Sequence, residues 1–212
     1  MSSSSFGDPY FETPQNHQEN EWVDLVAKKN EDKPEMLDII ITPDLINNKV
    51  KQFSNFKKPG INKVPNFWLK KLRGLHDSYA NCFTKIINCE MDAPDWFTTG
   101  TTSLLPKSNE TKKPNKYRPI CCLPTAYKLL TGIIADAIYE HLDGGNFLDE
   151  EQKGCRRGRQ GTKDQLLINR MILEDCKARG RDLSMAWIDY KKAYDSDLHS
   201  WLILCLVLYK SV

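Results

Sequence analysis

Apolar residues recur at steps of three and four in three segments of this chain, and Pro and Gly residues separate the segments. Such spacing predicts amphipathic helices. We expect one continuous helix over 65–90, a second over 125–142 and a third over 163–179. The third begins with Thr162 and has Gln165 three residues later, which is a capping-box pattern. This succession restricts the chain to a largely helical fold with few strands.

Two shorter segments predict strands. Residues 98–108 are rich in Thr, with Gly and Pro nearby, and indicate a short strand that leads into a basic loop. Leu183–Tyr190 is an apolar run of strand length that ends in an acid, and a helix-like apolar block follows over 201–209. Residues 1–35 contain few aliphatic side chains, which favours a flexible tail. The fold class predicted is therefore α+β.

Composition excludes several classes of protein. No apolar run approaches the roughly 20 residues of a membrane span, so no membrane partner is expected. The N-terminal residues lack the basic and apolar regions of a secretory signal, which favours the nucleus or cytoplasm. The seven cysteines form an odd set without a CxxC pair, so we expect reduced thiols and no disulfides.

Charge is distributed unevenly along the chain. Residues 1–35 are net acidic, whereas residues 36–212 carry 27 basic against 20 acidic side chains. Within this basic part, Lys49 to Arg73 and Lys153 to Lys163 contain no acid. Such blocks suit a polyanion such as nucleic acid, although runs of charge also form ordinary solvated surfaces.

Three local patterns carry potential chemistry. Asp189 ends the apolar run, where a carboxylate needs a cation or hydrogen bonds; a metal ligand and a turn cap both fit. Lys107 and Arg118 flank a polar loop, and such cations can hold a polyphosphate or simply contact solvent. Residues 151–161 combine three glycines with four basic side chains, which suits phosphates but matches neither common nucleotide-cradle motif.

The order of these patterns resembles the reverse transcriptases of non-LTR (LINE-type) retrotransposons. The resemblance extends over about 155 residues. The matching words, in order, are Lys58-Pro59-Gly60, Pro65-Asn66-Phe67-Trp68-Leu69-Lys70, Pro94-Asp95-Trp96, Leu105-Pro106-Lys107, Tyr117-Arg118-Pro119-Ile120, Tyr127-Lys128, Gln152-Lys153-Gly154, Gly158-Arg159-Gln160-Gly161-Thr162, Asp164-Gln165, Ile188-Asp189 and Ala193-Tyr194-Asp195-Ser196.

The resemblance implies a right-hand polymerase in which the fingers precede the palm. Residues 1–35 are then a disordered tail, 36–180 mostly helical fingers with a basic hairpin, and 181–212 the first palm strand and helix. The other palm carboxylates and the thumb of this family are expected beyond residue 212. Asp197-Leu198 stands where the family usually has Val-Pro. We therefore expect a fragment, truncated before the rest of the palm, that is inactive alone.

The resemblance also implies roles for single residues. Asp189 corresponds to the first catalytic aspartate, and Tyr190 to a backbone carbonyl ligand of the metal, which is Mg²⁺ or Mn²⁺. Lys107 and Arg118 correspond to the cations that bind the triphosphate. Tyr194 corresponds to the aromatic gate beneath the sugar 2′ position.

The basic block beyond residue 150 corresponds to a motif near the template. We assign template binding to Arg156, Arg159 and Gln160 on this resemblance. The implied function is RNA-directed DNA polymerisation with an RNA template, a DNA primer and dNTP. Two alternatives stay open, namely a non-catalytic nucleic-acid-binding relic of a polymerase and an RNA-templated RNA polymerase. The bulky side chain of Tyr194 argues against the second of these.

Overall fold

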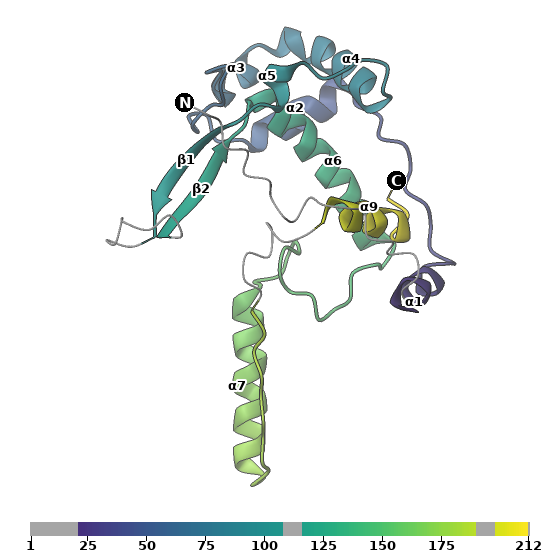
Figure 1. The fold of residues 1–212 in the computed structure, drawn as a ribbon, viewed down its shortest axis with the longest axis vertical. Coiled ribbons are helices and arrows are strands. Elements are labelled where there is room, and N and C mark those ends of the chain that lie inside the picture. The colour runs from purple at the N-terminus through teal and green to yellow at the C-terminus, as the bar shows by residue number, and fades with distance from the viewer. Residues whose placement is uncertain (1–20, 108–115, 190–197, 212) are drawn as a thin grey trace, which may run out of the picture. The chain divides into compact units, whose positions relative to one another are not determined.

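The computed structural model describes residues 21–107, 116–189 and 198–211 (Figure 1). The chain divides into two compact units, which we describe separately. The central unit is Leu37–Glu140, and the terminal unit combines Met1–Met36 with His141–Val212. The central unit begins one residue from the boundary expected at residue 36, and this division is no test of the expected ranges 1–35, 36–180 and 181–212. The assignment of fingers and palm to those ranges stays a prediction.

The central unit begins with helix α2 (Pro43–Gln52), which was not predicted from the sequence. The hydroxyl of Thr42 caps this helix by accepting a hydrogen bond from the backbone N–H of Leu45, at 3.2 Å. Pro43 occupies the first turn, where its missing N–H costs no hydrogen bond. The Thr42-Pro43-Asp44 sequence is thus a start signal that could have located the helix.

The continuous helix predicted over 65–90 is wrong. The structure has α3 (Asn66–Lys71), the 3₁₀ turn η2 (Arg73–Leu75) and α4 (His76–Ile87). The buried imidazole of His76 lies 2.8 Å from the carbonyl oxygen of Leu69. In an unbroken helix that carbonyl would accept from the backbone N–H four residues later, so the side chain satisfies a group that the break exposes.

Helix α6 (Thr125–Gly144) confirms the second predicted helix. Before it, β1 (Thr101–Pro106) and β2 (Tyr117–Cys122) form a two-stranded antiparallel sheet, which confirms the predicted strand and basic hairpin. The short helix α5 (Asp95–Thr98) precedes β1. The residues of this unit that are buried together come from α2, α3, α4, α5 and α6 and the loop before α2. They are Ile41, Ile46, Val50, Leu69, Ala80, Phe83, Phe97, Ala126, Leu129, Leu130 and Ile133.

The terminal unit joins the two ends of the described chain. Helix α1 (Glu21–Lys29) and helix α9 (His199–Leu208) meet through Trp22 and Trp201, whose ring centroids are 4.4 Å apart. Buried Asn30 donates a hydrogen bond to the Leu208 carbonyl at 3.0 Å. Helix α9 confirms the apolar helix expected over 201–209. The flexible tail expected over 1–35 is wrong for residues 21–29, which form helix α1. Trp201, which contacts this helix, lies in α9, almost the whole length of the chain away.

Helix α7 (Thr162–Ala178) confirms the third predicted helix but not its capping box. Gly161 is the N-cap residue, with φ of 57°, and Thr162 lies inside the helix. The carboxylate of Asp164 instead accepts a hydrogen bond from the backbone N–H of Gln160, at 2.8 Å. A positive φ is strained for residues with a Cβ, which explains why glycine precedes the helix.

The strand predicted over Leu183–Tyr190 is wrong for its described residues. Residues 181–189 form no regular element, and Trp187 and Ile188 are 73% and 82% exposed. A strand needs a neighbour to share backbone hydrogen bonds, and the described residues contain only the β1–β2 sheet. Tyr190 and Tyr194 lie outside the described residues.

Two observations apply to the residues that the structure describes. None of their helices is long and apolar enough to cross a membrane. All seven cysteines fall in the described ranges, and none of them forms a disulfide there.

Candidate functional site

The β1–β2 hairpin positions the two cations that the sequence singled out. Arg118 is paired with Leu105 across the sheet. The pairing extends one step beyond β1, where the backbone N–H of Lys107 donates to the carbonyl of Lys116 at 2.7 Å. Opposed residues of an antiparallel pair share a face, and so do residues two apart on one strand. Lys107, Lys116 and Arg118 therefore lie on one face of the hairpin.

A fourth cation reaches the same face. Lys58 donates a hydrogen bond from its ammonium group to the hydroxyl of Ser103, at 2.9 Å. Ser103 is two residues before Leu105 and thus on the face that carries Arg118. In the sequence, Lys58 belongs to the Lys58-Pro59-Gly60 motif and to the acid-free block. Neither pattern predicted that Lys58 lies beside the hairpin. The spacing of basic residues could not show it, because 45 residues separate the two partners.

Gly60 explains how the loop that carries Lys58 approaches this region. A Cβ at Gly60 would lie 2.4 Å from the backbone nitrogen of Pro124 and 2.5 Å from the carbonyl carbon of Leu123. Only glycine permits so close an approach. Nearby, the hydroxyl of buried Thr125 donates to the Val64 carbonyl at 2.7 Å and fixes the same loop to the start of α6.

The chemistry of this face is that of an anion site. Arg118 is exposed and offers a planar fork of donors, whereas the lysines act as point charges. Cations gathered on one rigid surface attract phosphate groups and hold them without recognising a base. The hairpin thus presents a preformed set of cations suited to a polyphosphate.

Asp189 is placed differently. The residue is exposed and lies in the segment 181–189, which has no regular structure. The described residues contain no cluster of three or more His, Cys, Asp or Glu side chains that could hold a metal ion. A carboxylate oxygen is the donor that Mg²⁺ prefers, so Asp189 suits the ion chemically. The proposed second ligand, Tyr190, lies outside the described residues.

The predicted template-binding residues lie in the terminal unit. Arg156 is largely buried at its side chain and is occupied within the chain: its guanidinium lies 3.2 Å from a carboxylate oxygen of Asp143 and donates to the Asp149 carbonyl at 2.9 Å. Arg159 and Gln160 are exposed. These contacts give Arg156 a structural role, while the assignment of all three residues to the template stays a prediction.

The structure therefore brings some predicted residues together and leaves others apart. Lys107 and Arg118 share one face of one hairpin in the central unit. Arg156 and Asp189 belong to the terminal unit, and no described contact joins them. The cation pair is the part of the site that the fold itself assembles.

Comparison with known proteins shows what this part of the chain is similar to. Residues 105–208 match the family described as reverse transcriptase (RNA-dependent DNA polymerase). The chain is also 24% identical over 201 residues to a probable RNA-directed DNA polymerase from transposon BS of Drosophila melanogaster. That similarity covers 89% of this chain, which spans about 22% of the length of the relative. Residues 105–208 are thus similar in sequence to reverse transcriptases.

Proposed function

We propose that this chain is the fingers and early palm part of a non-LTR retrotransposon reverse transcriptase, which copies an RNA template onto a DNA primer with dNTP. The observation that carries this proposal is the hairpin face. This face carries Lys107 and Arg118, and both residues lie inside the segment that matches reverse transcriptases. On this assignment the face binds the triphosphate of the incoming nucleotide.

Each residue of the proposed site has its own role. Lys107 and Arg118 orient the triphosphate and neutralise its charge, because phosphoryl transfer depends on positioning and electrostatics more than on covalent help. Asp189 would hold a divalent ion such as Mg²⁺ together with the backbone carbonyl of Tyr190. The ion would supply Lewis-acid chemistry at the phosphate oxygens. Tyr194 excludes a sugar 2′-hydroxyl by its bulk.

Nucleotide binding by the hairpin is the direct test. The 212-residue chain is titrated with a fluorescent deoxynucleoside triphosphate, and the variant Lys107→Ala/Arg118→Ala is titrated in parallel. We expect the double variant to lose about tenfold or more in affinity, since each charge-assisted hydrogen bond contributes about 1.5–3 kcal/mol. Arg118→Lys should lose part of this affinity, because an ammonium cannot replace the guanidinium fork.

The matched control is Lys85→Ala, which removes an exposed cation from the last turn of α4 in the same unit. This variant should bind the nucleotide as the native chain does. The hairpin variant removes two charges and Lys85→Ala removes one. An equal loss of binding free energy per charge removed would mean that the chain attracts nucleotide through its net charge, and the hairpin assignment would be wrong.

Primer extension tests the polymerase chemistry. Residues 1–212 alone should extend no primer, because Asp189 is the one catalytic carboxylate assigned to them and cannot hold two metal ions. A chimera joins residues 1–212 to the downstream residues of the Drosophila relative. Extension by this chimera should be abolished in Asp189→Asn; extension by 1–212 itself that disappears in Asp189→Asn would overturn the assignment of an inactive fragment.

The same chimera tests the gate. Tyr194→Ala should raise ribonucleotide use relative to deoxyribonucleotide use by about tenfold or more, equivalent to about 1.4 kcal/mol of discrimination. Tyr194→Phe should change this ratio little, because the volume of the ring is the barrier. An unchanged ratio in a folded Tyr194→Ala chimera would remove the argument for DNA rather than RNA synthesis.

A further inference from the structure

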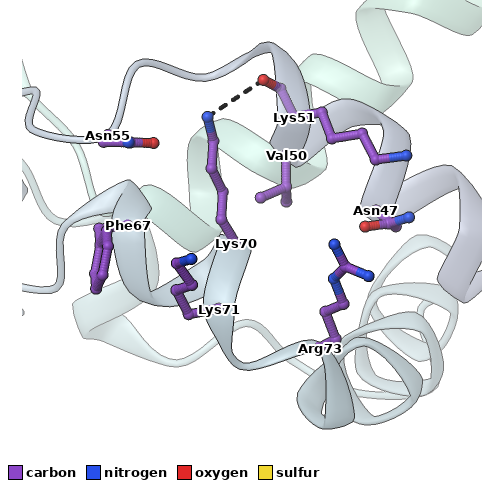
Figure 2. A pocket seen from close by; sticks show the side chains of 8 residues that line it. All are labelled: Asn47, Val50, Lys51, Asn55, Phe67, Lys70, Lys71 and Arg73. Carbon is purple, nitrogen blue, oxygen red and sulfur yellow. Dashed lines mark hydrogen bonds between the residues drawn. The ribbon is translucent and has the colours of Figure 1, made fainter.

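The central unit contains a second basic surface, away from the hairpin in sequence. A pocket of about 480 Å³ lies between the end of α2, the following loop and α3 (Figure 2). This volume is in the range of ligand pockets, about 300–1,000 Å³. The pocket is lined by Asn47, Val50, Lys51, Asn55, Phe67, Lys70, Lys71 and Arg73.

The lining carries an unbalanced positive charge. Lys51, Lys70, Lys71 and Arg73 surround one space, and no acidic residue lines it. Among residues 21–107, 116–189 and 198–211, no salt bridge engages these four cations. Like charges around one space repel each other, and an anion in that space relieves the repulsion. The pocket therefore selects for a negatively charged group.

Part of this charge has a structural use. Lys51, Lys70 and Lys71 lie in the last turns of α2 and α3, where cations interact favourably with the helix dipole. The ammonium group of Lys70 also donates to the carbonyl of Lys51 at 3.3 Å, as Figure 2 shows. Arg73 follows α3 in the turn η2, is exposed, and has no such use. Its guanidinium points into the space between the two helices.

Aromatic side chains adjoin the cations. The rings of Phe56 and Phe67 are stacked, with centroids 5.6 Å apart and an interplanar angle of 15°. Phe56 is 80% exposed, and Phe67 lines the pocket. The ammonium group of Lys71 lies 5.8 Å from the centroid of the Phe67 ring. A flat aromatic face beside a basic groove is the combination by which proteins hold single strands, with bases stacked and phosphates neutralised.

The geometry points to the α2–α3 pocket as a binding site for single-stranded nucleic acid. Lys71 and Arg73 each contact one of two successive backbone phosphates, and the Phe56–Phe67 pair stacks against an adjacent base. This inference deepens the proposed function, on which it rests for the presence of such a strand. The pocket recognises backbone and base plane, so it takes RNA and DNA strands with little preference for sequence.

The test is the binding of labelled ten-nucleotide RNA and DNA strands to the 212-residue chain, followed by fluorescence anisotropy without dNTP or metal. The variant Lys71→Gln/Arg73→Gln should lower affinity about tenfold. It should also flatten the plot of log K against log salt by about 1.4 units, since each phosphate contact to a single strand contributes about 0.7. Lys70 is left intact because it supports the end of α2.

The control variant is Lys28→Gln/Lys85→Gln, which removes the same charge from exposed last-turn positions of α1 and α4. It should retain native affinity and salt dependence. Phe56→Ala should weaken strand binding at least about fivefold, because the stacking of one base contributes this much or more. The same variant should leave the competition by inorganic pyrophosphate unchanged.

Each other outcome overturns the inference. Equal losses in the pocket and control variants would mean that general charge binds the strand. An unchanged affinity in Phe56→Ala, together with displacement of the strand by stoichiometric pyrophosphate, would mean that the pocket takes a small anion. A preference of more than about tenfold between RNA and DNA would contradict recognition by backbone and base plane. Because no nucleotide is incorporated in this assay, its failure is distinguishable from failure of the polymerase proposal.

Discussion

The central unit buries a cluster of apolar side chains, whereas helix α7 of the terminal unit buries none. Leu129 and Ile46 in the central unit are fully buried. In the terminal unit, helix α7 has no buried residue, and Leu167 on it is 60% exposed. Trp187 and Ile188, just before Asp189, are exposed as well. The two regions thus differ in how firmly packing holds the residues assigned to catalysis.

This difference separates the two halves of the proposed chemistry. Lys107 and Arg118 are carried by a hairpin whose register is fixed by backbone pairing. Asp189 lies in a segment with neither a paired strand nor buried neighbours. A binding site is precise only where packing and hydrogen bonds lock the side chains that form it. The structure therefore positions Lys107 and Arg118 on one hairpin, and it does not fix the Asp189 carboxylate in place.

The largest effect expected is on the core of the central unit. Leu129→Ala should lower the free energy of unfolding by about 2–5 kcal/mol, through lost burial and the cavity that remains. The matched variant Leu167→Ala should change it by no more than about 0.5 kcal/mol, as exposed substitutions do. Urea denaturation of both variants measures this. Similar losses in both would mean that α7 packs against the chain in solution and would remove the contrast.

A smaller effect is expected where two backbones meet. Gly60→Ala should destabilise the central unit by about 1–3 kcal/mol, because the added Cβ meets the backbone of Leu123 and Pro124, which cannot turn aside. Gly74→Ala is the control, since a Cβ there meets nothing within 4 Å. That variant should be neutral or slightly stabilising. Equal stability of the two variants by thermal denaturation would contradict the close approach.

Local patterns predicted helices α6, α7 and α9 and the hairpin. The stripe over 125–142 and the glycines after it predicted α6, and the Thr-rich run before Pro106 predicted β1. Two of the predictions that failed concern contacts that a periodic pattern does not describe. Helix α1 is held by α9, and the break before His76 depends on a hydrogen bond between a side chain and a backbone carbonyl. Neither contact leaves a periodic signal in the sequence.

The candidate site follows the same rule. The sequence identified Lys107 and Arg118, because both lie near the ends of one hairpin. It did not place Lys58 on that hairpin or assemble the α2–α3 pocket, although Lys58 and the four cations of the pocket belong to the acid-free block it noted. The run of cations predicted a polyanion partner. The side chains that share one space became evident only once α2 and α3 were packed together.

A third prediction compares two ion pairs, one in each unit. Lys49 on α2 pairs with Asp136 on α6, and its side chain is only 13% exposed. Lys49→Met keeps most of the packing but removes the charge, and should cost the central unit about 1–2 kcal/mol. Lys29→Met, which removes the exposed partner of Asp149 in the terminal unit, should cost less. A larger loss in Lys29→Met, measured by urea denaturation, would reverse the ranking.

The smallest effect is the pH dependence of the exposed pair. The hydrogen bond from Lys29, at 2.9 Å, and its charge hold the pKa of the Asp149 carboxyl below its ordinary value. The same hydrogen bond and the charge of Asp149 raise the pKa of Lys29 above its ordinary value. The contribution of Asp149 is therefore complete above the ordinary carboxyl value of 3.8 and is lost as the pH falls through the lowered pKa.

Lys29 gives the opposite limit, because its contribution is complete below 10.5 and is lost as the pH rises through the raised pKa. Hydrogen exchange of the α1 amides should therefore be slower in the native chain than in Lys29→Met at pH 6, and this difference should shrink on acidification below pH 3.8. Comparison with the variant at each pH cancels the intrinsic pH dependence of exchange. High salt should reduce the difference at pH 6 as well, because both side chains are more than half exposed. A difference that is the same at both pH values would mean that the stem of Lys29 packs α1 in place and that its charge contributes nothing.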